Sequence, residues 1–175
     1  MRIGWGQSTD VERENDMMTG PAIRLTPAPG TYALLLHCPA PVTVRAGRLG
    51  VIDLPAGYWV YVGSAFGPGG LRARLRHHLS PSPRPHWHLD YVKAAMDAVA
   101  IWSTTDPVKR EHDWATAFAT LRGATCPVAG FGASDCACRT HLIHLSRRPG
   151  FNGFRRRIRR AIRTHGPMDC LDLME

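Results

Sequence analysis

The stretch from Tyr58 to Leu79 constrains the fold more than any other part of the chain. It begins with aromatic and β-branched residues bounded by Gly57 and Gly63, a pattern typical of a short β-strand. A turn rich in glycine and proline follows at residues 67–70. Three leucines then recur at helical spacing, Leu71, Leu75 and Leu79. The stretch therefore predicts a strand, a glycine-rich loop and a helix in direct succession.

The predicted helix carries Arg74 and His78, which lie four residues apart and so share one helix face beside the leucines. Arg72 and Arg76 are expected to point to solvent, where they are candidates for contacts to nucleic acid. Two interpretations of Arg74 and His78 are open. In the first, Arg74 is a partly buried arginine and His78 a hydrogen-bonded core histidine. In the second, the two residues are a functional pair directed at whatever the helix packs on.

The remaining pattern predicts an α/β chain of the α+β type, with a small, mostly antiparallel central sheet flanked by helices. The core strands are expected near Thr31–His37, Val51–Leu54 and Tyr58–Val62, and Val42–Val44 should form a hairpin with Val51–Leu54 around Gly47. Further strands are expected at Asp97–Ser103 and His141–Leu145. Further helices are expected at His86–Met96 and from Pro107 to Arg122, the latter capped by Asp106.

A chain of 175 residues is long enough for one domain with a substantial core. Residues 1–28 lack periodicity and contain several prolines and glycines, so we expect a mostly disordered leader. Residues 29–146 hold the predicted domain. Residues 147–175 are expected to form a basic C-terminal tail.

That tail accounts for the net charge of +8, because Arg147–Arg163 contains eight arginines and no acidic residue. Its apolar residues share one side of a predicted amphipathic helix, namely Phe151, Phe154, Ile158 and Ile162. Such a helix binds a nucleic-acid backbone, lies on an anionic membrane, or packs on the domain. We favour binding to nucleic acid, and this is compatible with the helix also packing on the domain. The candidate residues are Arg155, Arg156, Arg159, Arg160 and Arg163.

Cysteine usage predicts the compartment. Five cysteines without a hydrophobic N-terminal segment favour a reducing environment, and hence the cytoplasm. No apolar run approaches the roughly 20 residues of a membrane helix, so no membrane partner is expected. Cys126, Cys136, Cys138 and His141 are a candidate set of tetrahedral zinc ligands. Cysteines that merely pack in a loop are the favoured alternative.

Glu111 falls inside the apolar stripe of the predicted Pro107–Arg122 helix. A carboxylate on an inward face is unfavourable unless it is paired or bound to a cation. The sequence leaves two interpretations of Glu111. It either forms a buried ion pair, for example with Arg74, or it is a metal ligand.

The ordered set of motifs resembles the GIY-YIG nuclease superfamily. Gly30-Thr31-Tyr32 opens the first strand, Tyr61-Val62-Gly63 ends a later one, and Leu71-x-x-Arg74 with His78 follows. Within that superfamily the chain is similar to Uri-superfamily endonucleases. This closer similarity rests on three segments, Gly63–Leu71, His86–Tyr91 and Gly130–Leu142. The resemblance covers about Pro29 to Leu145 and does not include the basic tail.

The resemblance implies a GIY-YIG-like fold and direct hydrolysis of DNA phosphodiester bonds by water. The implied catalytic residues are Tyr32, Tyr61, Arg74, His78 and Glu111. Glu111 matches the glutamate that holds the catalytic metal in the superfamily, so Mg²⁺ or Mn²⁺ is the expected cofactor. Two alternatives are a non-catalytic nucleic-acid-binding module and an interaction protein stabilised by zinc. Presence of all five residues argues against the first alternative.

Overall fold

The computed structural model describes residues 25–82, 84–85, 87–133 and 136–174. Most of the predicted leader, residues 1–24, lies outside this part of the chain. Its last residues do not behave as a disordered segment. The carbonyl oxygens of Thr26 and Ala28 accept hydrogen bonds from the backbone N–H groups of Arg72 and Leu71. The domain therefore begins slightly earlier than predicted.

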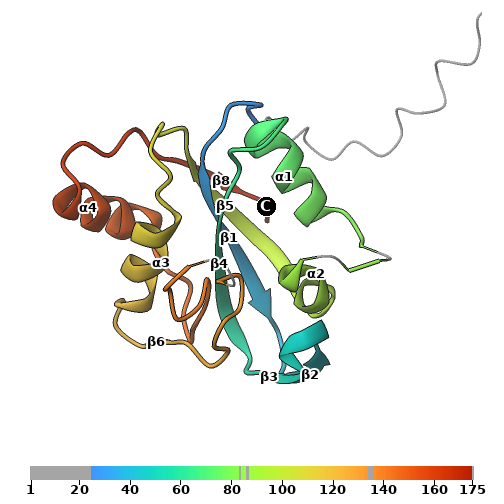
Figure 1. Cartoon of the computed structure of the whole chain (residues 1–175). Helices are drawn as coiled ribbons and strands as arrows, with labels where there is room; N and C mark the ends of the chain where they lie inside the picture. Colours follow the sequence, from blue (N-terminus) through green and yellow to red (C-terminus); the bar gives the residue numbers. More distant parts are fainter. Residues whose placement is uncertain (1–24, 83, 86, 134–135, 175) are drawn as a thin grey trace, which may run out of the picture.

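The centre of the molecule is a six-stranded antiparallel sheet in the order β6-β7-β4-β1-β5-β8 (Figure 1). Its strands are β1 Thr31–Cys38, β4 Gly57–Ser64, β5 Asp97–Thr104, β6 Ala124–Thr125, β7 Leu142–Leu145 and β8 Asp169–Asp172. The sheet and its flanking helices confirm the predicted α+β class. Strand β1 lies at the centre, because β4 pairs along one of its edges and β5 along the other.

The predicted hairpin is present, but its place in the fold differs from the prediction. Strands β2 Val42–Arg45 and β3 Val51–Leu54 pair with each other in a separate two-stranded sheet. The prediction that Val51–Leu54 belongs to the central sheet is therefore wrong. Both edges of β1 are already occupied, so β3 has no partner there. The hairpin instead packs Ile52 and Leu54 against the core and exposes Val51.

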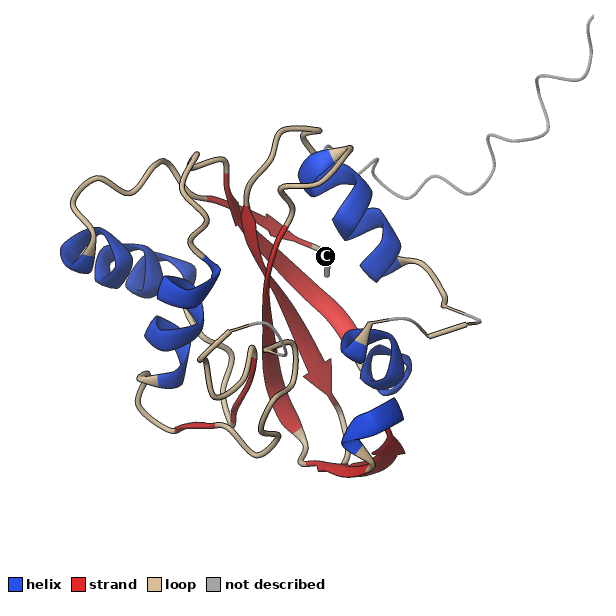
Figure 2. Ribbon diagram, viewed as in Figure 1, coloured by secondary structure: helices blue, strands red, loops and turns tan. Residues whose placement is uncertain are grey.

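The helices divide between the two faces of the sheet (Figure 2). Helix α1, Gly70–Leu79, covers one face together with the short α2, His88–Val92, and a 3₁₀ turn at Lys93–Ala95. Helices α3, Glu111–Ala119, and α4, Phe151–Ala161, cover the other face. Alternation along β1 explains the two cores. Tyr32, Leu34 and Leu36 join Leu71 and Leu75 on the first face. Ala33 and Leu35 join Trp114, Phe118 and Phe154 on the second.

The basic tail belongs to the domain. Phe154 and Ile158 of α4 are buried, and the ring of Phe154 stacks on Phe118 with centroids 3.9 Å apart. After α4 the chain returns to the sheet, where β8 pairs with β5. The sequence pattern did not predict β8. The packed-helix interpretation therefore holds for α4. None of the helices in the described residues is long and apolar enough to span a membrane.

Candidate functional site

One pocket, of about 470 Å³, contains four of the five predicted catalytic side chains. Tyr32 and Tyr61 contribute from the central strands, Arg74 from α1 and Glu111 from the first position of α3. Other lining residues include Gly63, Ser64, Trp87, His88, Lys109, Gly132 and His141. The fifth predicted residue, His78, lies behind Tyr32. The structure thus brings together side chains that are up to 79 positions apart in the chain.

The antiparallel register of β1 and β4 places the two tyrosines on the same face of the sheet. Tyr32 is opposite Gly63, Leu34 is opposite Tyr61, and the two phenol rings have centroids 6.4 Å apart. The Tyr32 ring lies directly across Gly63. A Cβ at position 63 would lie 2.6 Å from the ring carbon that bears the hydroxyl and would overlap the hydroxyl itself. A glycine is therefore required here if Tyr32 is to keep its position.

His78 fixes the Tyr32 side chain from the helix side. Its Nε2 atom lies 2.7 Å from the Tyr32 hydroxyl oxygen, and the imidazole is buried. Burial lowers the pKa of His78 to about 3, and the nearby charge of Arg74 acts in the same direction. Burial also raises the pKa of Tyr32 well above its ordinary value, with Tyr61 and Glu111 adding to the rise and Arg74 opposing it. At neutral pH His78 is uncharged and Tyr32 keeps its proton.

Arg74 presents its guanidinium group at the pocket by stacking on an aromatic ring. Its central carbon lies 4.0 Å from the centroid of the Trp87 ring, a close cation–π contact. Arg72 and Arg76, on the same helix, are exposed as predicted. Trp87 was not among the predicted site residues, because it lay within the predicted His86–Met96 helix, to which the sequence assigned no role.

Glu111 is buried and its ion pair differs from the one considered from sequence. Its Oε1 atom lies 2.8 Å from Nζ of Lys109, a half-exposed residue two positions earlier. Within the described residues no ion pair joins Glu111 to Arg74. Lys109 was missed from sequence, because a lysine two residues before a glutamate is too common a pattern to single out.

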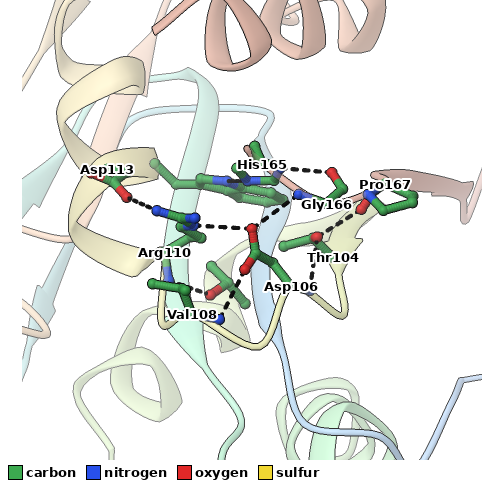
Figure 3. Close-up of polar contacts among 10 residues, drawn as sticks. Thr104, Asp106, Val108, Arg110, Asp113, His165, Gly166 and Pro167 are labelled. Atoms are coloured by element: carbon green, nitrogen blue, oxygen red, sulfur yellow. Dashed lines mark hydrogen bonds and ion pairs between the residues drawn. The ribbon is translucent and has the colours of Figure 1, made fainter. Parts of the chain in front are cut away.

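The turn that precedes α3 explains why the helix begins later than predicted (Figure 3). The Asp106 carboxylate accepts hydrogen bonds from the backbone N–H groups of Val108 and Gly166 and from Nε of Arg110. Asp106 therefore closes a turn and does not cap the helix, which starts at Glu111. Val108 is exposed and not part of the apolar stripe. This network attaches the start of α3 to the segment that follows α4.

We expect Asp106→Asn to destabilise the protein by roughly 1–3 kcal/mol at neutral pH, the usual effect of weakening hydrogen bonds to a buried charge. Burial alone would raise the pKa of Asp106, but the N–H groups of Gly166 and Val108 and the Arg110 side chain lower it below its ordinary value. A lowered folded-state pKa stabilises the fold above the unfolded-state pKa of about 3.9, and the contribution is lost as the pH falls through the folded-state value. The difference between wild type and variant, measured by denaturant unfolding, should therefore shrink in acid.

The matched control for this substitution is Asp113→Asn, because Asp113 is exposed and meets the same arginine at 3.5 Å. We expect it to change the free energy of unfolding by less than about 1 kcal/mol. An Asp106→Asn difference that stays constant from neutral to acidic pH would contradict the assigned role of the carboxylate.

His88 is a further pocket residue that sequence reasoning left without a role. Its Nδ1 atom accepts a hydrogen bond from the backbone N–H of Gly132 at 3.1 Å, and burial lowers the pKa of its imidazole. Gly132 has a φ of +68°, and a Cβ there would lie 3.0 Å from the Tyr61 ring. The bond therefore holds the loop after β6 against the tyrosine. His86, which belongs to the same predicted helix, lies outside the described residues.

Three of the four predicted zinc ligands come together, and the fourth does not. Cys136, Cys138 and His141 form a group with His112, and one potential ligand atom from each lies within 4.8 Å of the others. Cys126 was the candidate in place of His112, and it lies outside this group. Cys126 directly follows β6, where it is half-buried against the second core. The sequence offered Cys126 as the fourth candidate although it is distant from the other three, whereas the fold supplies a histidine from the first turn of α3.

The predicted nucleic-acid-binding arginines on and just after α4 belong to the segment that covers the face of the sheet opposite Tyr32 and Tyr61. Arg156, Arg159, Arg160 and Arg163 are exposed. Arg155 is half-buried, with its guanidinium carbon 5.5 Å from the centroid of the Phe151 ring. These arginines are therefore not part of the pocket.

Comparison with known proteins identifies a family for this chain. Residues 31–164 match the family described as "Domain of unknown function DUF123". No curated protein and no solved structure matches the chain.

Proposed function

The chain belongs to the DUF123 family of domains of unknown function, and from the chemistry of its pocket we propose that it is a metal-dependent endonuclease that hydrolyses DNA by direct attack of water. The observation that carries this proposal is the convergence of Tyr32, Tyr61, Arg74 and Glu111 on one pocket. The motif order, which resembles that of GIY-YIG nucleases, supports the same conclusion. The proposal assigns the chemistry to side chains on four different elements.

The pocket fits a divalent cation of the magnesium type. Mg²⁺ commonly binds one or two carboxylates and completes its octahedron with water and substrate phosphate. Glu111 supplies one such carboxylate, buried at the pocket wall beside a space large enough for a phosphate group. Glu111 would hold Mg²⁺ or Mn²⁺ in this position. A bound divalent cation lowers the pKa of a coordinated water and neutralises charge that develops on the phosphate.

Arg74 and Tyr32 have complementary roles in this proposal. The planar fork of Arg74 is suited to two phosphate oxygens, and its stacking on Trp87 limits the freedom that binding would remove. Tyr32 keeps its proton, and when the Nε2–H of uncharged His78 donates to the Tyr32 oxygen, that proton can be donated to an oxygen in the pocket. His78 is uncharged and acts as a positioning residue, because it holds the Tyr32 hydroxyl at 2.7 Å. Tyr61 contributes a second hydroxyl from the neighbouring strand.

One observation favours the alternative of a non-catalytic nucleic-acid-binding module. The Lys109 ammonium lies 2.8 Å from Glu111 Oε1 and supplies a cationic partner for this carboxylate from within the chain. In that alternative Arg74 and Lys109 would bind phosphate, and no bond would break.

A cleavage assay separates the two functions. Supercoiled, nicked, branched and single-stranded DNA would be incubated with the protein in Mg²⁺ or Mn²⁺, with chelator as the blank. The endonuclease proposal predicts metal-dependent cleavage of at least one substrate that stops with excess chelator. Binding of these substrates without cleavage in either metal would reject the proposal in favour of the binding module.

Charge removal on α4 tests its proposed role in DNA binding. Replacing Arg156, Arg159 and Arg160 by glutamine should reduce the steepness of the salt dependence of DNA affinity. Each lost phosphate contact on duplex DNA lowers the slope by about 0.9, so a reduction of up to roughly 3 is expected. These arginines are exposed, and the buried Phe154 and Ile158 remain. Affinity measured over a series of salt concentrations gives the slope.

The control for α4 is Arg45→Gln with Arg48→Gln, two exposed arginines on and beside the β2–β3 hairpin. An unchanged slope in the α4 variant would remove the helix from the DNA interface. Deletion of residues 151–175 is not a suitable test, because it would also remove β8 and the buried side chains of α4.

A further inference from the structure

A compact group of thiols and imidazoles lies beside the pocket, outside the proposed catalytic set. His112 comes from the first turn of α3, and Cys136, Cys138 and His141 come from the loop that leads into β7. The His112 Nδ1 atom lies 3.2 Å from the Cys138 sulfur, and the Cys136 sulfur lies 3.5 Å from His141 Nε2. Potential ligand atoms of all four residues lie within 4.8 Å of one another.

These separations approach those of a tetrahedral zinc site. Zinc binds sulfur at about 2.3 Å and imidazole nitrogen at about 2.0–2.1 Å, so neighbouring sulfur and nitrogen ligands are roughly 3.6 Å apart. The two measured sulfur–nitrogen distances lie close to this value. Two thiolates and two imidazoles form a closed four-ligand set typical of structural zinc, and soft sulfur ligands disfavour magnesium.

We propose that His112, Cys136, Cys138 and His141 bind one Zn²⁺ ion in a structural site of the Cys₂His₂ type. The site joins two segments that are distant in sequence, α3 and the loop before β7. It is separate from the Glu111 position proposed for Mg²⁺, and it does not depend on the proposed nuclease function.

The surroundings of the two histidines support this assignment. If Nδ1 of His112 binds the metal, its Nε2 carries the proton, and that atom lies 3.6 Å from Oε1 of Glu111. Metal-bound histidines usually direct their second ring nitrogen at a carboxylate, carbonyl or water in this way. His141 is fixed through its backbone, because its N–H donates to Phe131 at 2.7 Å and its carbonyl accepts from Val62 at 2.9 Å.

The zinc site would therefore form part of the wall of the pocket. His141 lines that pocket, and Val62 follows Tyr61 directly on β4. A zinc ion would hold the loop against β4 and would hold His112 next to Glu111. Its expected role is to set the position of the pocket wall, because four protein ligands leave no open coordination position for a substrate.

Metal analysis of the purified full chain, without added metal or a metal-binding tag, tests the proposal. Elemental analysis should find about one equivalent of zinc, the stoichiometry of a single four-ligand site. Cys138→Ser and His112→Asn should each lose most of it. The matched control is Cys126→Ser, which removes a half-buried cysteine outside the group and should retain the zinc. Arg74→Ala should also retain it, so that loss of zinc and loss of cleavage are measured separately.

A second measurement covers the case in which the ligand variants do not fold. Chelator treatment of the wild type should release zinc and increase the reactivity of Cys136 and Cys138 towards a thiol reagent, located by mass spectrometry, more than that of Cys126. Co²⁺ in place of zinc should give the visible spectrum of a tetrahedral site with thiolate ligands. Wild-type protein that lacks zinc and does not bind Co²⁺ tetrahedrally would overturn the proposal. Zinc retained by His112→Asn but lost from Cys126→Ser would also overturn it.

Discussion

Replacing Arg74 by alanine should lower the rate of DNA cleavage by about 10²–10³-fold, the usual effect of losing one electrostatic contact to a transition state. The guanidinium group stacks on Trp87 and lines the pocket with Glu111. Because Arg74 is half-exposed and its neighbours Leu71 and Leu75 carry the packing of α1, thermal melting should change little. Single-turnover cleavage and thermal melts of the same preparations give both quantities.

Arg72→Ala and Arg76→Ala are matched controls on the same helix, because both residues are exposed. Each should alter binding modestly and leave the cleavage step near the wild-type rate. Arg74→Lys keeps the charge but loses the planar fork, so it should recover only part of the lost rate. Equal losses from Arg72→Ala and Arg74→Ala would show that general charge, and not the position at the pocket, governs cleavage.

Replacing Glu111 by glutamine should also lower cleavage by about 10²–10³-fold, because the substitution keeps the shape of the side chain but removes the charge proposed to hold the metal. Its effect on folding should be small. Lys109 is half-exposed, so its ammonium can stay hydrated after the substitution, and glutamine removes the cost of holding a charge at a buried position. Excess Mn²⁺ should not restore the wild-type rate. Cleavage rates at increasing metal concentration, together with thermal melts, measure these effects.

Asp113→Asn is the matched control for Glu111, since it removes an exposed carboxylate from the same helix. It should cleave like the wild type. A loss of roughly 3–5 kcal/mol in the free energy of unfolding of Glu111→Gln, the usual cost of breaking a buried pair, would instead identify Glu111 as a structural residue.

Local patterns were sufficient to predict the part of the fold that holds the tyrosines. Aromatic and β-branched residues bounded by glycines identified β4, and leucine spacing identified α1. The sequence placed Tyr32 and Tyr61 on two predicted core strands, and the register shows that these strands are neighbours. The requirement for glycine at position 63 could not be seen in the sequence, because only the structure shows that the Tyr32 ring lies across this residue.

Features that depend on distant parts of the chain were predicted less well. Strand β3 resembles a core strand, but β4 and β5 occupy both edges of β1, and β3 pairs with β2 instead. Strand β8 carries an aspartate at each end and lies at a sheet edge, so it lacks the pattern of a buried strand. His112, and not Cys126, joins the candidate metal-ligand group because the start of α3 lies beside the loop before β7. Spacing in one segment contains no information about that contact.

The most direct test of the proposed active site is the single-turnover cleavage rate of the double variant Glu111→Gln/Arg74→Ala beside the two single variants and the wild type. Residues that serve one transition state lose activity non-additively, so the double variant should be little slower than the slower single variant. All four proteins should melt at similar temperatures. Single variants that cleave DNA at the wild-type rate would contradict the account, as would unfolded single variants whose stability the double variant restores.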